Sequence, residues 1–251
     1  MKSENKDNSL VGKRIVLFGG SSGIGLATAK AAVEDGALVV IVSGNEHQIS
    51  NALKELPQGT EGYFADLTNE EEVKQVFEKV GNFDHLVFAA GERSELTKLS
   101  AIEIEDVKRY FNLQYYGAVT AVKCGTPYIY DGGSIVLTSG IDSLKPDPGW
   151  FLGASICTVM EGFTRTKASE LKSIRINVVS SGVVLANLWP GLSETDRQEV
   201  YNYAGEELPS EKEIETAEIA EIFLYCMRHP FITGRFLVTD GGMHLFNNFS
   251  L

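Results

Sequence analysis

The chain contains 251 residues, 43% of them hydrophobic, which is enough for one large domain with a buried core. Its formal net charge of −12 argues against non-specific binding to nucleic acid or to an anionic membrane. The N-terminus lacks the apolar core of a signal peptide, and no apolar run approaches the ~18 residues of a membrane span. The 3 cysteines and 4 histidines are dispersed, so we expect a reducing, cytoplasmic setting and no bound metal.

Short apolar runs alternate with helical patterns along the whole chain. Runs rich in Val, Ile and Leu predict strands, and the amphipathic segments between them predict helices. In chain order we expect strands at 14–18, 37–43, 62–66, 85–91, 133–139, 175–181 and 234–238. The expected helices alternate with them. The first two end near Glu34 and Leu56, the next three cover 69–80, 101–123 and 154–172, and the last ends near Met227.

Buried strands separated by helices predict an α/β fold with one Rossmann-type domain. We expect a doubly wound, parallel, seven-stranded sheet with helices on both faces. The polar residues 1–10 predict a flexible N-terminal tail, and residues 11–251 form the predicted domain. Within it, a helix-rich insertion at 190–210 precedes the last helix.

The stretch FGGSSGIG follows the first strand and opens the first helix. Its glycines, Gly19, Gly23 and Gly25, let the backbone approach a pyrophosphate, while the helix N-terminus supplies N–H donors and a positive dipole. A simple strand-to-helix turn is the alternative interpretation. The position between a strand and a helix favours a dinucleotide site.

This glycine spacing resembles that of the short-chain dehydrogenase/reductase superfamily, and the resemblance extends over about residues 11 to 243. ADLT is similar to the family motif whose aspartate contacts adenine, DHLVFAAG to the strand beside the cofactor, and FNLQ to the segment with a catalytic asparagine. EGFTRTKASEL, IRINVVSSG and ITGRFLVTDGG match in the same order. The resemblance implies a cofactor site formed by Gly19, Ser21, Ser22, Gly23, Ile24, Gly25, Ser43, Gly44, Asn45, Asp66, Leu67, Ala89, Ala90, Gly91, Gly182 and Val184.

The end of the second strand bears on the choice between the two nicotinamide cofactors. An acid there would hold the ribose hydroxyls of NAD(H), and a basic residue one position later would pair with the 2′-phosphate of NADP(H). Ser43 and Gly44 occupy these positions, so the phosphate meets no repulsion. Ser43, Asn45 or His47 could donate to it, whereas Glu46 could instead reach a ribose. We expect NADP(H) to be preferred over NAD(H).

The family's catalytic serine, tyrosine and lysine are all replaced, by Gly140, Gly153 and Cys157. In the family the tyrosine gives a proton to the carbonyl oxygen, the lysine lowers the tyrosine pKa, and the serine hydrogen-bonds the substrate. The candidate catalytic residues that remain are Asn112, Asp142 and Ser139, with Asp142 as a desolvated general acid. We expect the substrate pocket to include Gly140, Trp150, Gly153, Cys157, Asn187 and Leu188.

These replacements leave more than one function open. The first hypothesis is an NAD(P)-dependent reductase of a small organic substrate with a nonstandard proton source, for which an imine, an iminium or an activated alkene would demand less than a ketone. The second is an inactive dinucleotide-binding sensor, scaffold or subunit, and the third a lyase or isomerase. The insertion at 190–210 resembles the family's substrate lid, which favours catalysis. The resemblance also implies a homodimer or homotetramer.

Overall fold

The computed structural model describes residues 9–92, 98–146, 148–182, 184–185 and 214–245. Seven strands form one sheet in the order β3-β2-β1-β4-β5-β6-β9, and every neighbouring pair is parallel. The predicted α/β class and the seven predicted strands are confirmed. The strands are β1 (Arg14–Phe18), β2 (Leu38–Ser43), β3 (Glu61–Phe64), β4 (Phe83–Phe88), β5 (Ile129–Gly140), β6 (Arg175–Ser181) and β9 (Phe236–Thr239).

The chain reverses its direction across the sheet between β1 and β4. From β1 it moves outward through β2 to β3, and it then returns to β4 on the other side of β1. In open parallel sheets, ligands bind outside the carboxyl ends of the strands at such a switch point. The glycine-rich turn after β1 therefore lies where a ligand is expected.

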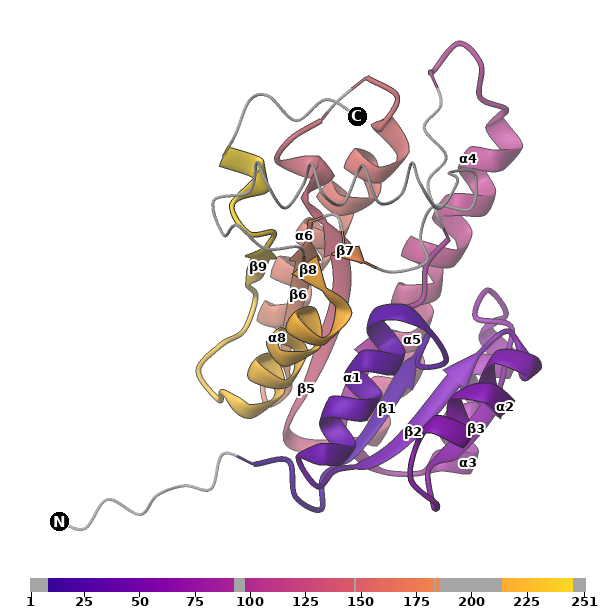
Figure 1. The fold of residues 1–251 in the computed structure, drawn as a ribbon, viewed down its shortest axis with the longest axis vertical. Helices are drawn as coiled ribbons and strands as arrows, with labels where there is room; N and C mark the ends of the chain where they lie inside the picture. Colours follow the sequence, from indigo (N-terminus) through magenta and orange to yellow (C-terminus); the bar gives the residue numbers. More distant parts are fainter. Residues whose placement is uncertain (1–8, 93–97, 147, 183, 186–213, 246–251) are drawn as a thin grey trace, which may run out of the picture.

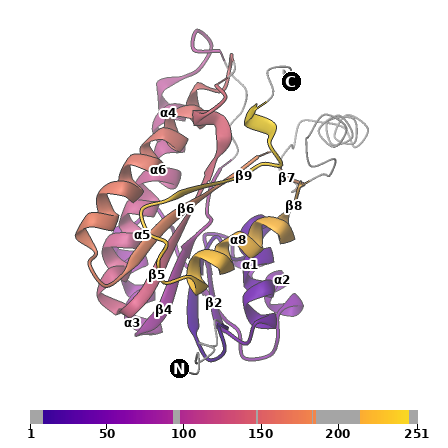
Figure 2. The same ribbon diagram turned by 90° about the vertical axis from the view of Figure 1, so that its left-hand side faces the viewer.

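Helices cover both faces of the sheet (Figure 1, Figure 2). Helices α1, α2 and α8 lie on one face, and α3, α4, α5 and α6 lie on the other. Because strand side chains alternate, Val16 and Phe18 of β1 join the apolar core under the second group, and Ile15 and Leu17 join the core under the first. The helices are α1 (Gly23–Glu34), α2 (Glu46–Glu55), α3 (Glu70–Val80), α4 (Ile104–Phe111), α5 (Gly117–Gly125), α6 (Phe151–Glu170) and α8 (Thr216–Arg228).

Two features differ from the sequence prediction. The long helix predicted at 101–123 is α4 and α5 joined by a π-helical segment, Asn112–Tyr116. Such segments are rare and frequently occur at functional sites. In addition, β7 (Val184–Leu185) pairs in parallel with β8 (Ile214–Glu215) as a separate two-stranded sheet.

The N-terminal boundary of the folded domain also needs correction. Leu10, placed in the predicted flexible tail, is only 2% exposed, and its N–H donates to Asp35 Oδ2 over 2.9 Å. Burial of this apolar side chain stabilises the position of Leu10, so the folded domain begins no later than this residue. Residues 1–8 and the predicted lid at 190–210 lie outside the described residues. Of the helices in the described ranges, none is long and apolar enough to cross a membrane.

Candidate functional site

The turn between β1 and α1 favours glycine at all three motif positions, at Gly23 through its φ of +51° and at the other two through close packing. Gly19 has φ +82°, and a Cβ atom there would lie 2.6 Å from the Ala89 carbonyl carbon. A Cβ atom on Gly25 would overlap the Gly19 carbonyl oxygen and lie 2.8 Å from its carbon. Side chains at these positions would force β1, α1 and the end of β4 apart, so the glycines permit the close packing from which the turn is built.

Ser22 is the N-cap residue of α1, but its side chain makes no capping hydrogen bond within the described residues. The first N–H groups of a helix have no partner inside the helix. An uncapped N-terminus leaves these donors and the positive end of the helix dipole available to an anion.

A cavity of about 410 Å³ lies beside this turn, over the carboxyl ends of β1, β2, β3 and β4. It combines backbone from the glycine turn with the segments that follow the other three strands. The predicted cofactor residues that line it are Gly19, Ser21, Ser22, Ser43, Gly44, Asp66, Leu67, Ala89, Ala90 and Gly91.

Six predicted cofactor residues do not line this cavity. Gly23, Ile24 and Gly25 shape the start of α1 behind it, and the Asn45 side chain caps α2. Gly182 packs against Asp240, where an added Cβ would lie 2.9 Å from the Asp240 Cβ, and Val184 is buried in β7. For these residues a direct cofactor contact stays a prediction.

Three residues of the cavity were not among the sequence predictions: Gln48, Phe64 and Leu113. Gln48 is in the first turn of α2, three residues after the N-cap. Phe64 ends β3 and shares the strand alternation of Asp66, which is a signal that the sequence does contain. Leu113 belongs to the π-helical segment, and no sequence pattern indicates that its side chain faces the cavity.

Asp66 stabilises its own loop as well as lining the cavity. One oxygen, Oδ1, accepts hydrogen bonds from the Thr68 backbone N–H at 2.9 Å and from the Thr68 hydroxyl at 2.7 Å. The Asp66 N–H donates to Glu72 Oε2 at 2.8 Å. These bonds hold the carboxylate at the cavity wall, where the family resemblance places a contact to adenine.

The three positions that replace the family's catalytic residues come together in space. The Gly140 N–H, at the end of β5, donates to the Cys157 sulfur over 3.2 Å, and both Gly153 and Cys157 lie on the buried side of α6. Asp142, in the turn after β5, completes the cluster. A Cβ atom on Gly153 would overlap Asp142 Oδ2 and lie 3.2 Å from its carboxyl carbon. The Asp142 carboxyl therefore occupies the space where a larger side chain at position 153 would begin.

Burial changes the acidity of both titratable groups in this cluster. Desolvation raises the pKa of Asp142 from 3.8 to about 6. Desolvation also raises the pKa of the Cys157 thiol, and the Asp142 charge raises it further. The Ser139 hydroxyl and the Gly140 and Asp142 backbone amides oppose that rise. Near neutral pH the thiol stays protonated, and Asp142 is the group poised to exchange a proton.

The other predicted site residues lie around this cluster. Ser139 is buried, and its hydroxyl is close enough to Cys157 to affect the thiol pKa, yet it has no hydrogen-bond partner of ordinary geometry among the described atoms. Asn112 begins the π-helical segment, is exposed, and its carbonyl accepts from the Gly117 N–H. Trp150 is the N-cap residue of α6. Asn187 and Leu188 lie outside the described residues.

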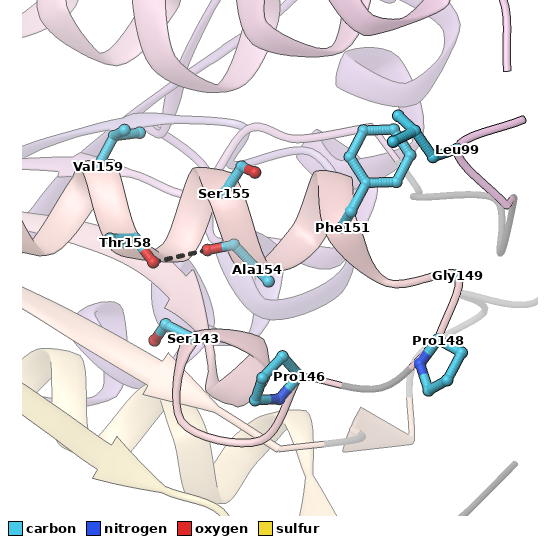
Figure 3. Close-up of a pocket in the computed structure, with 10 residues that line it drawn as sticks. All are labelled: Leu99, Ser143, Pro146, Pro148, Gly149, Phe151, Ala154, Ser155, Thr158 and Val159. Atoms are coloured by element: carbon cyan, nitrogen blue, oxygen red, sulfur yellow. Dashed lines mark hydrogen bonds between the residues drawn. The ribbon is translucent and has the colours of Figure 1, made fainter.

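A wider groove of about 670 Å³ runs along the outer face of α6 (Figure 3). Phe151, Ala154 and Thr158 form part of its floor, and Pro146 and Pro148 of the loop before α6 border it. The buried Gly153 and Cys157 are absent from its lining. The groove is therefore separate from the cluster around Asp142.

A parallel sheet with a glycine turn after its first strand, an uncapped helix behind the turn, and a cavity at the switch point define a Rossmann-type dinucleotide-binding protein. Residues 19–244 match the family model described as Enoyl-(Acyl carrier protein) reductase. The chain belongs to the short-chain dehydrogenase/reductase superfamily, a family of oxidoreductases.

Similar proteins cover nearly the whole chain. Carbonyl reductase family member 4 of Danio rerio is 31% identical over 92% of this chain and 97% of its own. A small-chain dehydrogenase crystallised with NADPH is 31% identical, with a TM-score of 0.83 over 94% of this chain and 100% of its own. MalC Reductase/Diels-Alderase from Malbranchea aurantiaca is 29% identical, with a TM-score of 0.86 over 94% and 97% of the two chains.

Proposed function

We propose that this protein is an NAD(P)H-dependent reductase in which the Asp142 carboxyl replaces the tyrosine as proton donor. The overlap between Asp142 Oδ2 and a Cβ atom on Gly153 carries this proposal. The carboxyl belongs to the turn after β5, whereas a tyrosine would extend into the same space from α6. The carboxyl lies beside Gly153, at the base of the space that a tyrosine side chain would fill, and it would supply the proton from a different element.

The described residues fit a nicotinamide dinucleotide. Gly19 and Gly25 keep the turn free of side chains, and the uncapped start of α1 offers N–H donors to a pyrophosphate. When bound, the reduced cofactor supplies hydride. The relative crystallised with NADPH supports this class of cofactor. The lack of an acid at Ser43 and Gly44 supports NADP(H) over NAD(H).

The acid chemistry of Asp142 follows from its burial. A general acid works best when its pKa is near the working pH, and burial brings the pKa of Asp142 to about 6. The protonated carboxyl gives its proton to the substrate atom that becomes basic as hydride adds to the neighbouring carbon. The carboxylate left behind is the costly form in this site, and it takes up a proton again from solvent.

An imine suits these residues better than a ketone does. Reduction of a ketone builds negative charge on oxygen, and Gly140 and Cys157 offer neither a hydroxyl nor a cation to stabilise it. An imine nitrogen takes up a proton more readily, and the iminium cation it becomes is attracted to the Asp142 carboxylate. We therefore propose a small organic imine as the substrate class.

A substrate panel tests this function. Purified protein with NADPH is offered cyclic imines, ketones and enones, and the loss of nicotinamide absorbance is followed. We expect turnover of imines, and a loss on the order of a hundredfold or more in kcat for Asp142→Asn. The matched control is Asp131→Asn, since Asp131 is exposed and accepts a bond from Ser173 that an asparagine oxygen could also accept. Equal imine turnover by Asp142→Asn and wild type would reject Asp142 as the acid.

A second candidate is a dinucleotide-binding protein without turnover. The observation that favours it is the replacement of all three family catalytic residues at Gly140, Gly153 and Cys157. It predicts that calorimetry detects NADPH binding while every substrate in the panel leaves the absorbance unchanged. Turnover of any substrate, lost in Asp142→Asn, would exclude it.

We also propose that the protein forms a homodimer or homotetramer in the cytoplasm. The apolar groove on the outer face of α6 supports a subunit contact there, and three free thiols, Cys124, Cys157 and Cys226, support a reducing compartment. Sedimentation equilibrium of the full chain tests the assembly. A monomer over the whole micromolar range would reject it.

A further inference from the structure

The rim of the cofactor cavity between the glycine turn and α2 is formed by three polar side chains: Ser21, Ser43 and Gln48. The Ser21 hydroxyl donates to Gln48 Oε1 over 3.5 Å, which links the two elements across the rim. The Gln48 backbone N–H donates to Asn45 Oδ1 over 3.0 Å, so the first turn of α2 is firmly capped. The backbone of Gln48 is thereby fixed, while its exposed carboxamide can rotate.

The other polar side chains near the expected ribose 2′ position are shorter or do not line the cavity. The Ser22 and Ser43 hydroxyls line it on short side chains, whereas Asn45 is not in the lining and its Oδ1 caps α2. The His47 ring is directed along the helix, with Nδ1 3.4 Å from Asn51 Nδ2. Glu46 does not line the cavity. Gln48 is left as the longest polar side chain on this rim.

Charge does not distinguish the two cofactors at this site. Among the described residues of the lining there is no lysine or arginine, and the acid among them, Asp66, accepts two bonds from Thr68. Discrimination by these residues then comes from neutral donors. A carboxamide offers two N–H donors, and a hydrogen bond to a phosphate is strengthened by the charge of the acceptor.

We infer that Gln48, steadied by Ser21, selects NADP(H) by donating its carboxamide N–H to the 2′-phosphate. The Ser21 hydroxyl donates to the Gln48 oxygen over 3.5 Å, which leaves the NH₂ group as the part of the carboxamide that can donate to a phosphate. This inference rests on the dinucleotide binding proposed above and does not depend on turnover.

Isothermal calorimetry with 2′,5′-ADP and 5′-ADP tests the inference without a reaction. Wild type is expected to bind 2′,5′-ADP the more tightly. Gln48→Glu should lower the affinity for 2′,5′-ADP roughly tenfold or more, since it replaces a charge-assisted bond with a repulsion. The affinity for 5′-ADP should stay within about twofold of the wild-type value. Gln48→Met removes the donor without adding charge, so a smaller loss confined to 2′,5′-ADP is expected.

Gln75→Glu is the matched control, because it adds the same charge on the exposed face of α3, away from the lining residues. It should change neither affinity. Glutamate also suits position 48, since glutamate three residues after an asparagine N-cap stabilises a helix start. Loss of fold is therefore not expected, and thermal unfolding checks this directly.

The inference is overturned if both Gln48 variants keep the wild-type ratio of the two affinities, or if they lower both affinities equally. It is also overturned if wild type binds 5′-ADP more tightly than 2′,5′-ADP. If wild type binds neither nucleotide, the inference fails together with the cofactor site. If the expected ratios are found but the substrate panel shows no turnover, the inference stands and only the reductase proposal fails.

Discussion

Asp142→Asn should stabilise the protein at neutral pH, although it removes a candidate catalytic group. Burial raises the pKa of Asp142 from 3.8 to about 6, so the fold favours the protonated carboxyl. Ionised Asp142 then weakens the fold, an effect that is absent below the unfolded value of 3.8 and complete above about 6. A difference of about two pKa units corresponds to about 3 kcal/mol, which a neutral asparagine would recover.

Urea denaturation at two pH values measures this effect. Asp142→Asn should raise the free energy of unfolding by about 3 kcal/mol near pH 7.5 but by only about 1 kcal/mol near pH 4.5. Asp131→Asn, at an exposed position, should show no such pH-dependent gain. An equal change for Asp142→Asn at both pH values, or destabilisation at the higher one, would refute the reasoning from burial.

Four further predictions concern the site. The imine reductase rate should fall about tenfold per pH unit above about pH 6, as Asp142 loses its proton, measured with a substrate that does not itself titrate there. Gly153→Ala should lower kcat at least about tenfold by displacing the Asp142 carboxyl, whereas Gly162→Ala, in open space on the same helix, should raise stability by about 1 kcal/mol and leave kcat unchanged. Gly25→Ala should abolish NADPH binding in calorimetry and cost more than about 2 kcal/mol in thermal unfolding, since its Cβ would overlap the Gly19 oxygen. Cys157→Lys should lower the pKa of Asp142 in an NMR titration by placing a cation beside it; an unchanged pKa would mean that the two side chains do not meet.

The sheet was predictable because its central strands carry continuous apolar runs, although the edge strand β3 (Glu61–Phe64) does not. Residues such as Val39–Val42 in β2 and Ile135–Leu137 in β5 are buried on both faces, and runs of this kind between helices specify a parallel sheet. The π-helical segment was not predictable, because one extra residue in a helical turn leaves the pattern of apolar positions nearly unchanged. The pairing of β7 with β8 was missed because each strand has only two residues.

The site was only partly predictable for a related reason. Backbone contacts impose glycine, so Gly19 and Gly25 were evident from their spacing. Gln48 is an ordinary residue for the first turn of a helix, and only the packing of α2 beside the glycine turn brings it to the cavity. Asp142 was predicted as a candidate from its place after β5. That its carboxyl fills the space beside Gly153 depends on the turn from Gly140 to Ser143, which no periodicity specifies.

Two of the three replacements in the catalytic cluster, those at positions 153 and 157, are best understood as one change. A side chain larger than glycine at position 153 would displace the Asp142 carboxyl, so the glycine admits the acid. A lysine at position 157 would pair with that carboxyl and lower its pKa, whereas the buried Cys157 thiol stays neutral and adds no cation. At position 140 a Cβ atom would lie at ordinary contact distances, 3.4 Å from the Cys157 sulfur and 3.8 Å from Asp142 Oδ2, so the replacement at position 140 has no such steric explanation. The replacements at positions 153 and 157 therefore leave room for the Asp142 carboxyl and keep a cation away from it, so that burial holds its pKa at about 6 and the carboxyl can give a proton to a substrate.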